Sequence, residues 1–238
     1  AEGGQVTITS THLNEGDVDD AGVGLTYSVT TAPLNGQLEL TTNAGASISS
    51  FTQDDIDNSR LIYVHDDSQT SSDSFVFSLA DGGENGATPA TGTFSFTINN
   101  VNDAPVNSVP GGQTVAEDTS LTISGISVDD ADGNLSTVRL SVTNGVLDIT
   151  PSGTATISAG ANSSSDLTLS GTQADINTTL ATLSYQGNPN FSSADTLTVL
   201  STDADAATAS GTVAITVNPA NDAPQFTLLP PSFSPHEV

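Results

Sequence analysis

Short stretches in which apolar and polar residues alternate recur along most of the chain. This two-residue periodicity is typical of β-strands with one buried and one exposed face, and the glycine, asparagine and aspartate residues between the stretches favour turns. The sequence therefore predicts an all-β protein. The strands that the pattern predicts are Val6–Ile8, Leu25–Val29, Phe75–Leu79 and Phe94–Ile98, followed by Leu121–Ile123, Val138–Val142, Leu197–Leu200 and Val213–Val217.

Two segments depart from the strand pattern. In Gln53–Ser59 and Gln173–Leu183, an Asp-Ile pair lies within a polar stretch that has no run of β-branched residues. Helix is the better prediction for such a stretch. We expect one short helical turn in each segment, connecting strands of two different sheets.

The chain contains an internal repeat. Its clearest mark is Asn102-Asp103-Ala104-Pro105, which returns as Asn221-Asp222-Ala223-Pro224. Further matches occur in the same order at nearly constant spacing: Glu2 with Glu117, Thr52–Ile56 with Thr172–Ile176, Tyr63 with Tyr185, and Asp73 with Asp195. With roughly seven short strands per repeat, this order predicts two tandem Greek-key β-sandwich domains. We expect them at residues 1–103 and 104–222, with residues 223–238 as a tail or the start of a following repeat.

The charge of the chain is strongly one-sided. Its 238 residues include 28 Asp and Glu but only two basic residues, Arg60 and Arg139, so the formal net charge is -26. Such a polyanion repels nucleic acid and anionic membrane surfaces and attracts cations. A simpler reading, that the acidity only maintains solubility, also stays open.

The absent residue types exclude further classes of protein. Cysteine is missing, so disulfides and thiolate metal sites are impossible. No apolar run approaches the ~20 residues that span a bilayer. We therefore expect no direct membrane insertion, and a monomer that relies on its core or on bound ions for stability.

The carboxylates gather in expected loops rather than along the strands. The acidic groups lie in Asn14–Asp20, His65–Asp67, Asp129–Asp132 and Asp203–Asp205. Dense like charge is costly unless a cation lies among the carboxylates, and Ca²⁺ takes six to eight oxygen ligands of this kind. The clustering therefore indicates calcium.

The segment Asn100–Pro105 resembles the calcium-binding linker of cadherin repeats. The resemblance implies that ligands come from the end of one domain, from the linker and from the start of the next domain. The candidate ligands are Glu2, Asn100, Asn102, Asp103, Asp130, Asp132, Asp203 and Asp205, with Glu117, Asn221 and Asp222 as repeat equivalents and Asp17, Asp19 and Asp66 from the acidic loops. The chain departs from the cadherin pattern at Asn100 and Ala104, where cadherins have Asp and Asn, and it has no match to their mid-domain Asp-Arg-Glu motif.

The first repeat also resembles the chondroitin sulfate proteoglycan type of cadherin-like repeat. Its matching segments are Leu25–Tyr27, Pro33–Leu38, Phe51–Asp57, Tyr63–Asp66, Asp73–Phe75 and Asp81-Gly82. The second repeat is similar to the cadherin-like repeats of large bacterial surface adhesins, through Val115–Asp118 and Asn221–Pro224. These resemblances imply an extracellular, cell-surface extender whose partners are the neighbouring repeats of its own chain.

Catalytic motifs are weak, so we do not expect an enzyme. The histidines His12, His65 and His236 show no grouping with a nucleophile and an orienting acid. The segment Asp130–Asn134 has EF-hand-like oxygen spacing, but its glycine is displaced and Ser141 occupies the bidentate glutamate position. An adhesion module that binds a surface glycan or a protein remains the alternative to a calcium-stiffened spacer, although aromatic residues make up only 5% of the chain.

Overall fold

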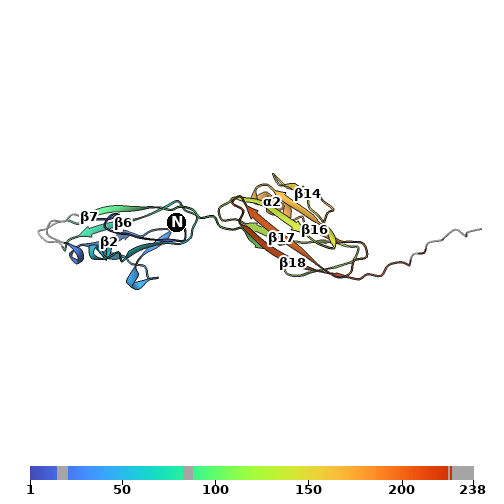
Figure 1. Cartoon of the computed structure of the whole chain (residues 1–238), viewed down its shortest axis with the longest axis horizontal. Coiled ribbons are helices and arrows are strands. Elements are labelled where there is room, and N and C mark those ends of the chain that lie inside the picture. Colours follow the sequence, from blue (N-terminus) through green and yellow to red (C-terminus); the bar gives the residue numbers. More distant parts are fainter. Residues whose placement is uncertain (15–20, 83–87, 225, 227–238) are drawn as a thin grey trace, which may run out of the picture. The chain divides into compact units, whose positions relative to one another are not determined.

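The computed structural model describes residues 1–14, 21–82, 88–224 and 226. By internal contacts the chain separates into two compact units, Ala1–Asn102 (unit 1) and the part from Asp103 onward (unit 2). Both units are built almost entirely of strands (Figure 1). The expected all-β sandwich class is confirmed.

Unit 1 consists of two sheets with a core between them. One sheet has the order β1 (Gln5–Thr7), β5 (Leu61–His65) and β3 (Gly36–Leu40). The other has the order β4 (Ser50–Thr52), β2 (Thr26–Thr31), β6 (Ser72–Ala80) and β7 (Ala90–Thr97), and all pairings are antiparallel. Two short 3-10 turns, Gly22–Gly24 and Thr41–Asn43, were not expected from the sequence.

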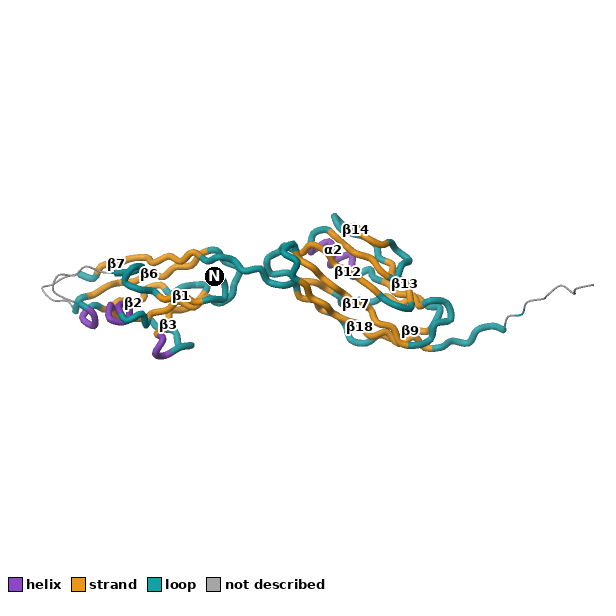
Figure 2. Tube along the Cα trace, in the orientation of Figure 1, coloured by secondary structure: helices purple, strands orange, loops and turns teal. Residues whose placement is uncertain are grey.

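Unit 2 has a larger sheet and more strands than the predicted seven. Its main sheet has the order β14 (Thr156–Gly160), β15 (Asp166–Ser170), β12 (Leu135–Ser141), β17 (Ala194–Asp203), β18 (Thr208–Asn218) and β9 (Gln113–Ala116). A second sheet contains β10 (Ser120–Thr122), β16 (Ser184–Gly187) and β13 (Gly145–Asp148), and a two-stranded ribbon joins β8 (Val106–Ser108) to β11 (Ser127–Asp129). Figure 2 shows these strands in orange. The β9–β18 pairing is parallel.

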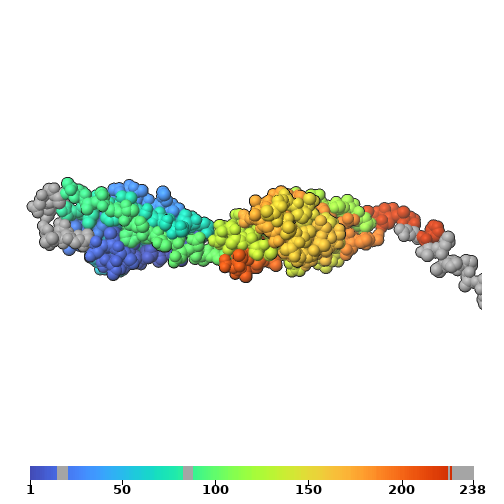
Figure 3. Space-filling view, turned by 90° about the horizontal axis from the view of Figure 1, so that it is seen from above, coloured from blue at the N-terminus to red at the C-terminus, as the bar shows by residue number. Residues whose placement is uncertain are grey.

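Both predicted helices are present and connect different sheets. Helix α1 (Gln53–Asp57) follows β4 and leads to β5, and α2 (Gln173–Leu180) follows β15 and leads to β16. Each begins after a threonine, Thr52 or Thr172, whose hydroxyl accepts the backbone N–H three residues later. At eight residues, α2 is longer than the single turn we expected. The face of unit 2 in Figure 3 is formed mainly by residues coloured yellow to orange, the segment that contains α2.

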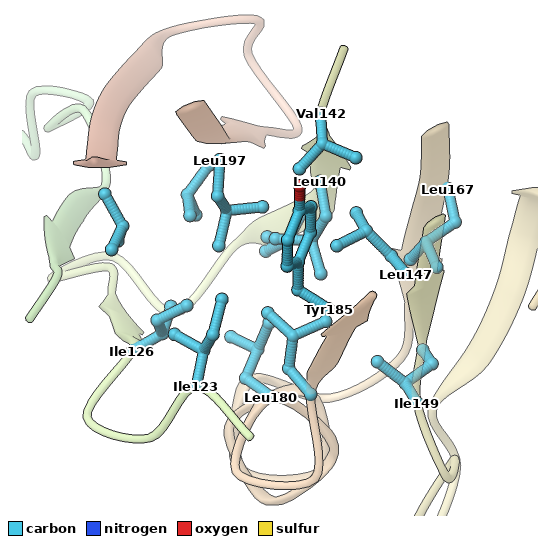
Figure 4. Close-up of a cluster of buried hydrophobic side chains, with 14 of the residues drawn as sticks. Ile123, Ile126, Leu140, Val142, Leu147, Ile149, Leu167, Leu180, Tyr185 and Leu197 are labelled. Carbon is cyan, nitrogen blue, oxygen red and sulfur yellow. The ribbon is translucent and has the colours of Figure 1, made fainter. Parts of the chain in front are cut away.

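The two cores differ in composition. In unit 1 aromatic rings stack: the Tyr27 and Phe51 centroids are 4.8 Å apart and those of Tyr63 and Phe96 are 3.9 Å apart. In unit 2 aliphatic side chains surround Tyr185, which lies among Leu140, Leu147 and Val142 (Figure 4). These aromatic side chains therefore fill cores, as the alternation predicts.

Candidate cation-binding site

Three segments bring acidic residues together at one end of unit 2. The loop 130–134 joins β11 to β12, the loop 204–207 joins β17 to β18, and Asp103 precedes β8. Because β8 pairs with β11 so that Val106 lies opposite Asp129, the chain before β8 runs beside the first loop. The Asp103 N–H donates to Asp132 Oδ2 at 2.7 Å. The structure thus gathers candidates that lie far apart in sequence.

Asp130 is the most buried acid of the first loop, with 5% of its surface exposed. Its backbone N–H donates to Gln173 Oε1 at 3.0 Å, and its Oδ1 accepts the Asn134 N–H at 3.2 Å. Its Oδ2 is buried with no hydrogen-bond donor. Leaving a buried carboxylate oxygen without a partner costs free energy, and a bound cation would remove that cost.

Asn134 ties the two loops to each other. The Ala204 N–H donates to the Asn134 carbonyl at 3.0 Å, and Asn134 Nδ2 donates to Asp205 Oδ2 at 3.1 Å. Asp203, 3% exposed, accepts the N–H groups of Asp205 and Ala207 on its Oδ1 at 2.9 and 2.8 Å. The five candidates Asp103, Asp130, Asp132, Asp203 and Asp205 therefore share one network, which we call the acidic end of unit 2.

Glu2 is held near the C-terminal end of β7 in unit 1. Its N–H donates to the Asn99 carbonyl at 2.9 Å, and its Oε2 accepts the Val101 N–H at 3.1 Å. Its Oε1 is buried without a donor, like Asp130 Oδ2. The Asp67 carboxylate lies close by, because a Cβ placed on Gly3 would come within 2.3 Å of Asp67 Oδ1. Unit 1 thus also has a buried acid with an unpaired oxygen.

Glu117 repeats the Glu2 geometry in unit 2. Its N–H donates to the Asn218 carbonyl at 2.8 Å, and its Oε1 accepts the Ala220 N–H at 2.7 Å. The match of Glu2 with Glu117 made from the sequence is therefore reproduced in three dimensions. Asn221 and Asp222 follow directly and are both exposed.

The remaining candidates are dispersed. Asn100 and Asn102 belong to unit 1 and are exposed. Asp66 is exposed after β5, where hydrogen bonds from Ser68, and then the nearby charge of His65, hold the pKa of its carboxyl below the usual range. Asp17 and Asp19 lie outside the described residues.

The acidic end of unit 2 is not a closed metal cage. Within the ranges that the structure describes, no three or more His, Cys, Asp or Glu side chains are grouped closely enough to hold an ion. Its available donors are carboxylate, amide and carbonyl oxygens, which suit Ca²⁺ better than zinc. Asp130 would bind directly through Oδ2, and the other acids would have to turn toward the ion. The donor atoms of these residues are therefore of the type that binds calcium, but the acidic side chains are not all arranged around one point.

The sequence analysis missed the residues that support Asp130. Asn134 and Gln173 bind Asp130, and Gln173 Nε2 also donates to Asp129 Oδ1 at 2.9 Å. The sequence pattern could have indicated Asn134, because it follows Asp130 and Asp132 at the same two-residue spacing of oxygen-bearing side chains. No sequence pattern indicated Gln173. Its counterpart in the first repeat, Gln53, has a different role and accepts the Tyr27 hydroxyl at 2.7 Å.

Two family models match the chain, each over less than half of its length. Residues 1–103 match the model described as "Cadherin-like". Unit 1 is therefore similar to cadherin-like domains. Residues 117–211 match a different model, described as "Protein GAMETE EXPRESSED 2 domain". The cadherin-like part of the expected resemblance is thereby confirmed.

Similar curated proteins are far longer than this chain. FRAS1-related extracellular matrix protein 2 of Homo sapiens is 37% identical over 107 residues, which is 44% of this chain and 3% of that protein. Chondroitin sulfate proteoglycan 4 of Mus musculus is 32% identical over 156 residues, which is 60% of this chain and 6% of that protein. The chain therefore spans a few per cent of these relatives. They support the chondroitin sulfate proteoglycan type of repeat and the expected extracellular location.

Solved structures similar to this chain include cadherins. One is described as "Protocadherin gammaB7 EC3-6 cis-dimer structure", with 16% identity, 82% of this chain and 40% of that chain covered, and a TM-score of 0.37. No helix in the described part of the chain is long and apolar enough to cross a membrane.

Proposed function

We propose that the chain is a pair of non-catalytic, extracellular structural repeats that bind Ca²⁺. In this proposal the repeats act as spacers in a larger surface protein, a bacterial adhesin by the resemblance of the second repeat. The relatives named as extracellular matrix proteins support a structural role. Unit boundaries at residues 1–103, 104–222 and 223–238 belong to the same proposal.

The observation that carries the calcium proposal is Asp130 Oδ2. It is buried and has no hydrogen-bond donor. It lies in a network with Asp132, Asp203 and Asp205, in a chain of net charge -26. Ca²⁺ is the cation whose preferred ligands match these oxygens. Because it would bind only folded protein, it would stabilise unit 2 by about 2.7 kcal/mol at a hundredfold excess over its Kd.

The test is thermal unfolding of the full chain in chelator and in calcium, with Asp130→Asn as the diagnostic variant. In chelator, Asp130→Asn should unfold at the wild-type temperature or above it, because it removes a buried carboxylate oxygen that has no donor. In calcium, the wild-type protein should gain stability and Asp130→Asn should gain much less.

Asp148→Asn is the matched control. Asp148 accepts hydrogen bonds from the backbone and hydroxyl of Ser163, apart from the acidic network. This variant should lose some stability in both buffers yet keep the full response to calcium. If the wild-type unfolding temperature is the same in chelator and in millimolar calcium, the calcium proposal is wrong.

Stiffening of the linker is a second part of the proposal, and it rests on the sequence of Asn100–Pro105 alone. A linker whose oxygens bind an ion has fewer accessible backbone conformations than a free one. Solution scattering should then give a longer and narrower distribution of particle lengths in calcium than in chelator. If the distributions of particle length are equal in calcium and in chelator, the stiffening proposal is wrong. That result would not contradict the proposal that unit 2 binds Ca²⁺.

The enzymatic alternative depends on His65, and the contacts of that side chain favour a structural role. His65 Nδ1 accepts the N–H groups of Gly3 and Asp67, each at 3.2 Å, and Nε2 lies 3.0 Å from Thr70 Oγ1. Both ring nitrogens are thus used to hold the chain. Binding of a surface glycan or a protein remains the second candidate function, and a glycan array probed with the full chain tests it.

A further inference from the structure

Strand β11 has a strand along one edge and a helix along the other. On one side it pairs with β8, so that Val128 lies opposite Asn107. On the other side the Val128 N–H donates to Asn177 Oδ1, and Asn177 Nδ2 donates to the Val128 carbonyl, each at 2.9 Å. Asn177 belongs to α2. One side-chain amide of the helix therefore makes the pair of hydrogen bonds that a neighbouring strand would make.

A second amide of α2 extends this contact to the first acid of the loop 130–134. Gln173 accepts the Asp130 N–H on Oε1 at 3.0 Å, and its Nε2 donates to Asp129 Oδ1 at 2.9 Å. Gln173 and Asn177 are four residues apart, and residues with this spacing lie on the same face of a helix. Both amides therefore reach the same edge of β11. We call these two side chains the amide clamp.

The amide clamp is built on a well-packed part of unit 2. Ile176 and Leu180 of α2 are 0% exposed, Val128 of β11 is 1% exposed, and all three belong to the same core. Side chains in a close-packed core have little freedom to move. The helix and the strand are thus fixed relative to each other before the loop 130–134 begins.

Asp130 is held at every polar atom but one. Its N–H donates to Gln173, its carbonyl accepts the Gly133 N–H at 3.1 Å, and its Oδ1 accepts the Asn134 N–H at 3.2 Å. Within the described part of the chain, only Oδ2 has no donor. Neither the main chain nor the carboxylate of Asp130 can turn without breaking a hydrogen bond, so the unpaired oxygen has a defined direction.

Helix α1 of unit 1 does not carry the same pair of amides. The repeat matches Gln53 with Gln173 and, one turn later, Asp57 with Asn177. Gln53 Nε2 donates to Asp57 Oδ1 at 2.9 Å, and Gln53 Oε1 accepts the Tyr27 hydroxyl at 2.7 Å. Asp57 has no N–H in its side chain with which to donate to a main-chain carbonyl, as Asn177 does. The amide clamp is thus a feature of unit 2 rather than a requirement of the shared sandwich.

We propose that Gln173 and Asn177 are positioning residues for the cation at the acidic end of unit 2. This role rests on the proposed calcium binding and explains how the site is prepared for it. Because the clamp fixes Val128 and Asp130 in the absence of an ion, the start of the loop does not have to become ordered when the ion binds. Binding then avoids that loss of conformational entropy. The calcium affinity therefore depends on two uncharged side chains of a helix.

Calorimetric titration of the full chain with calcium tests the positioning role. Gln173→Ala and Asn177→Ala each release part of the segment Val128–Asp130 from α2. The dissociation constant for Ca²⁺ should rise by about tenfold in each variant, the effect of ordering one or two residues on binding. The titrations are made well below the unfolding temperatures of all variants. If Asn177→Ala does not fold, Gln173→Ala alone decides the result, because its hydrogen bonds are only part-buried or exposed.

Asn162→Ala is the matched control. Asn162 Oδ1 accepts the Ile149 N–H and Asn162 Nδ2 donates to the Ile149 carbonyl, each at 2.9 Å. These are the same two hydrogen bonds that Asn177 makes to Val128, but their partner Ile149 is not part of the acidic network. Asn162→Ala should unfold at a lower temperature in chelator and still bind calcium with the wild-type dissociation constant.

Hydrogen exchange in chelator gives a second measurement that needs no ion. The Asn134 N–H donates to Asp130 Oδ1, so its exchange rate reports whether Asp130 is held in place. Gln173→Ala should speed exchange at Asn134 by about tenfold, the effect of losing one hydrogen bond that supports the loop. Asn162→Ala should leave this rate unchanged.

The outcomes separate the positioning role from calcium binding itself. If the wild-type protein binds no calcium, the calcium proposal is wrong and the positioning role is wrong with it. If the wild-type protein binds calcium and Gln173→Ala binds it equally tightly, or if Asn162→Ala weakens binding as much, only the positioning role is wrong. Unchanged exchange at Asn134 in Gln173→Ala also overturns the positioning role, because the clamp would then not hold the loop.

Discussion

At the scale of single residues, two buried aspartates organise equivalent corners of the units. Asp73 accepts the N–H groups of Leu34 and Asn35, each at 3.0 Å, together with the Tyr63 hydroxyl. Asp195 does the same with Thr143, Asn144 and Tyr185. The sequence revealed that these Tyr and Asp residues repeat. Their contacts could not be predicted, because the turn that donates the N–H groups lies far from both in sequence.

Asp73→Asn should make the stability of unit 1 less dependent on pH. Burial acts to raise the pKa of Asp73, but hydrogen bonds from Leu34, Tyr63, Asn35 and Ser74 outweigh it and lower the pKa. A lowered folded-state pKa contributes stability that is present above the unfolded value of about 3.9 and is lost as the pH falls through the folded value. The variant should lose about 1–3 kcal/mol at pH 7 and lose less on acidification below pH ~4. Denaturant unfolding between pH 7 and pH values below ~4 measures the free energy of unfolding of both proteins. If this free energy changes with pH equally in the wild-type protein and in Asp73→Asn, the stabilising role given to the Asp73 carboxylate is wrong.

At the scale of elements, alternation predicted the long central strands because their burial alternates. In β17 the buried residues include Asp195, Leu197 and Val199, and in β18 they are Val213, Ile215 and Val217. The pattern failed for short strands of the periphery, such as β8, β9 and β14. Their pairing depends on partners elsewhere in the chain, and their few buried positions give no detectable period.

Gly145→Ala should destabilise unit 2 at the first residue of β13, where this strand packs on β16. A Cβ on Gly145 would lie 2.4 Å from the Tyr185 ring and 2.6 Å from the Gln186 carbonyl oxygen, so backbone would have to move. We expect a loss of about 1–3 kcal/mol, the usual range for overpacking. Gly111→Ala is the control, because its Cβ would meet no atom within 4 Å. Equal unfolding midpoints for the two variants would show that the start of β13 accommodates the added Cβ without cost.

At the scale of the whole molecule, the sequence predicted which acidic residues lie together. It did not predict their burial or their hydrogen bonds. Asp103, Asp130, Asp132, Asp203 and Asp205 do share one end of unit 2. Asp130 Oδ2 is buried without a donor, and the Asp130 backbone N–H donates to Gln173, which belongs to a helix distant in sequence. A sequence pattern can predict a cluster of charge, but the burial of one oxygen is a property of the folded packing.

The net charge of -26 predicts that monovalent salt alone stabilises the protein. Repulsion among 28 acids with two basic partners acts over a screening length of about 30 Å at 0.01 M salt and about 3 Å at 1 M. In chelator, the unfolding temperature should therefore rise steadily with NaCl, and equally with choline chloride if screening is the cause. Calcium added at constant ionic strength should give a further rise that Asp130→Asn largely lacks. A salt response without that further rise would mean that diffuse screening alone makes the clustered carboxylates tolerable, and no bound ion would be needed.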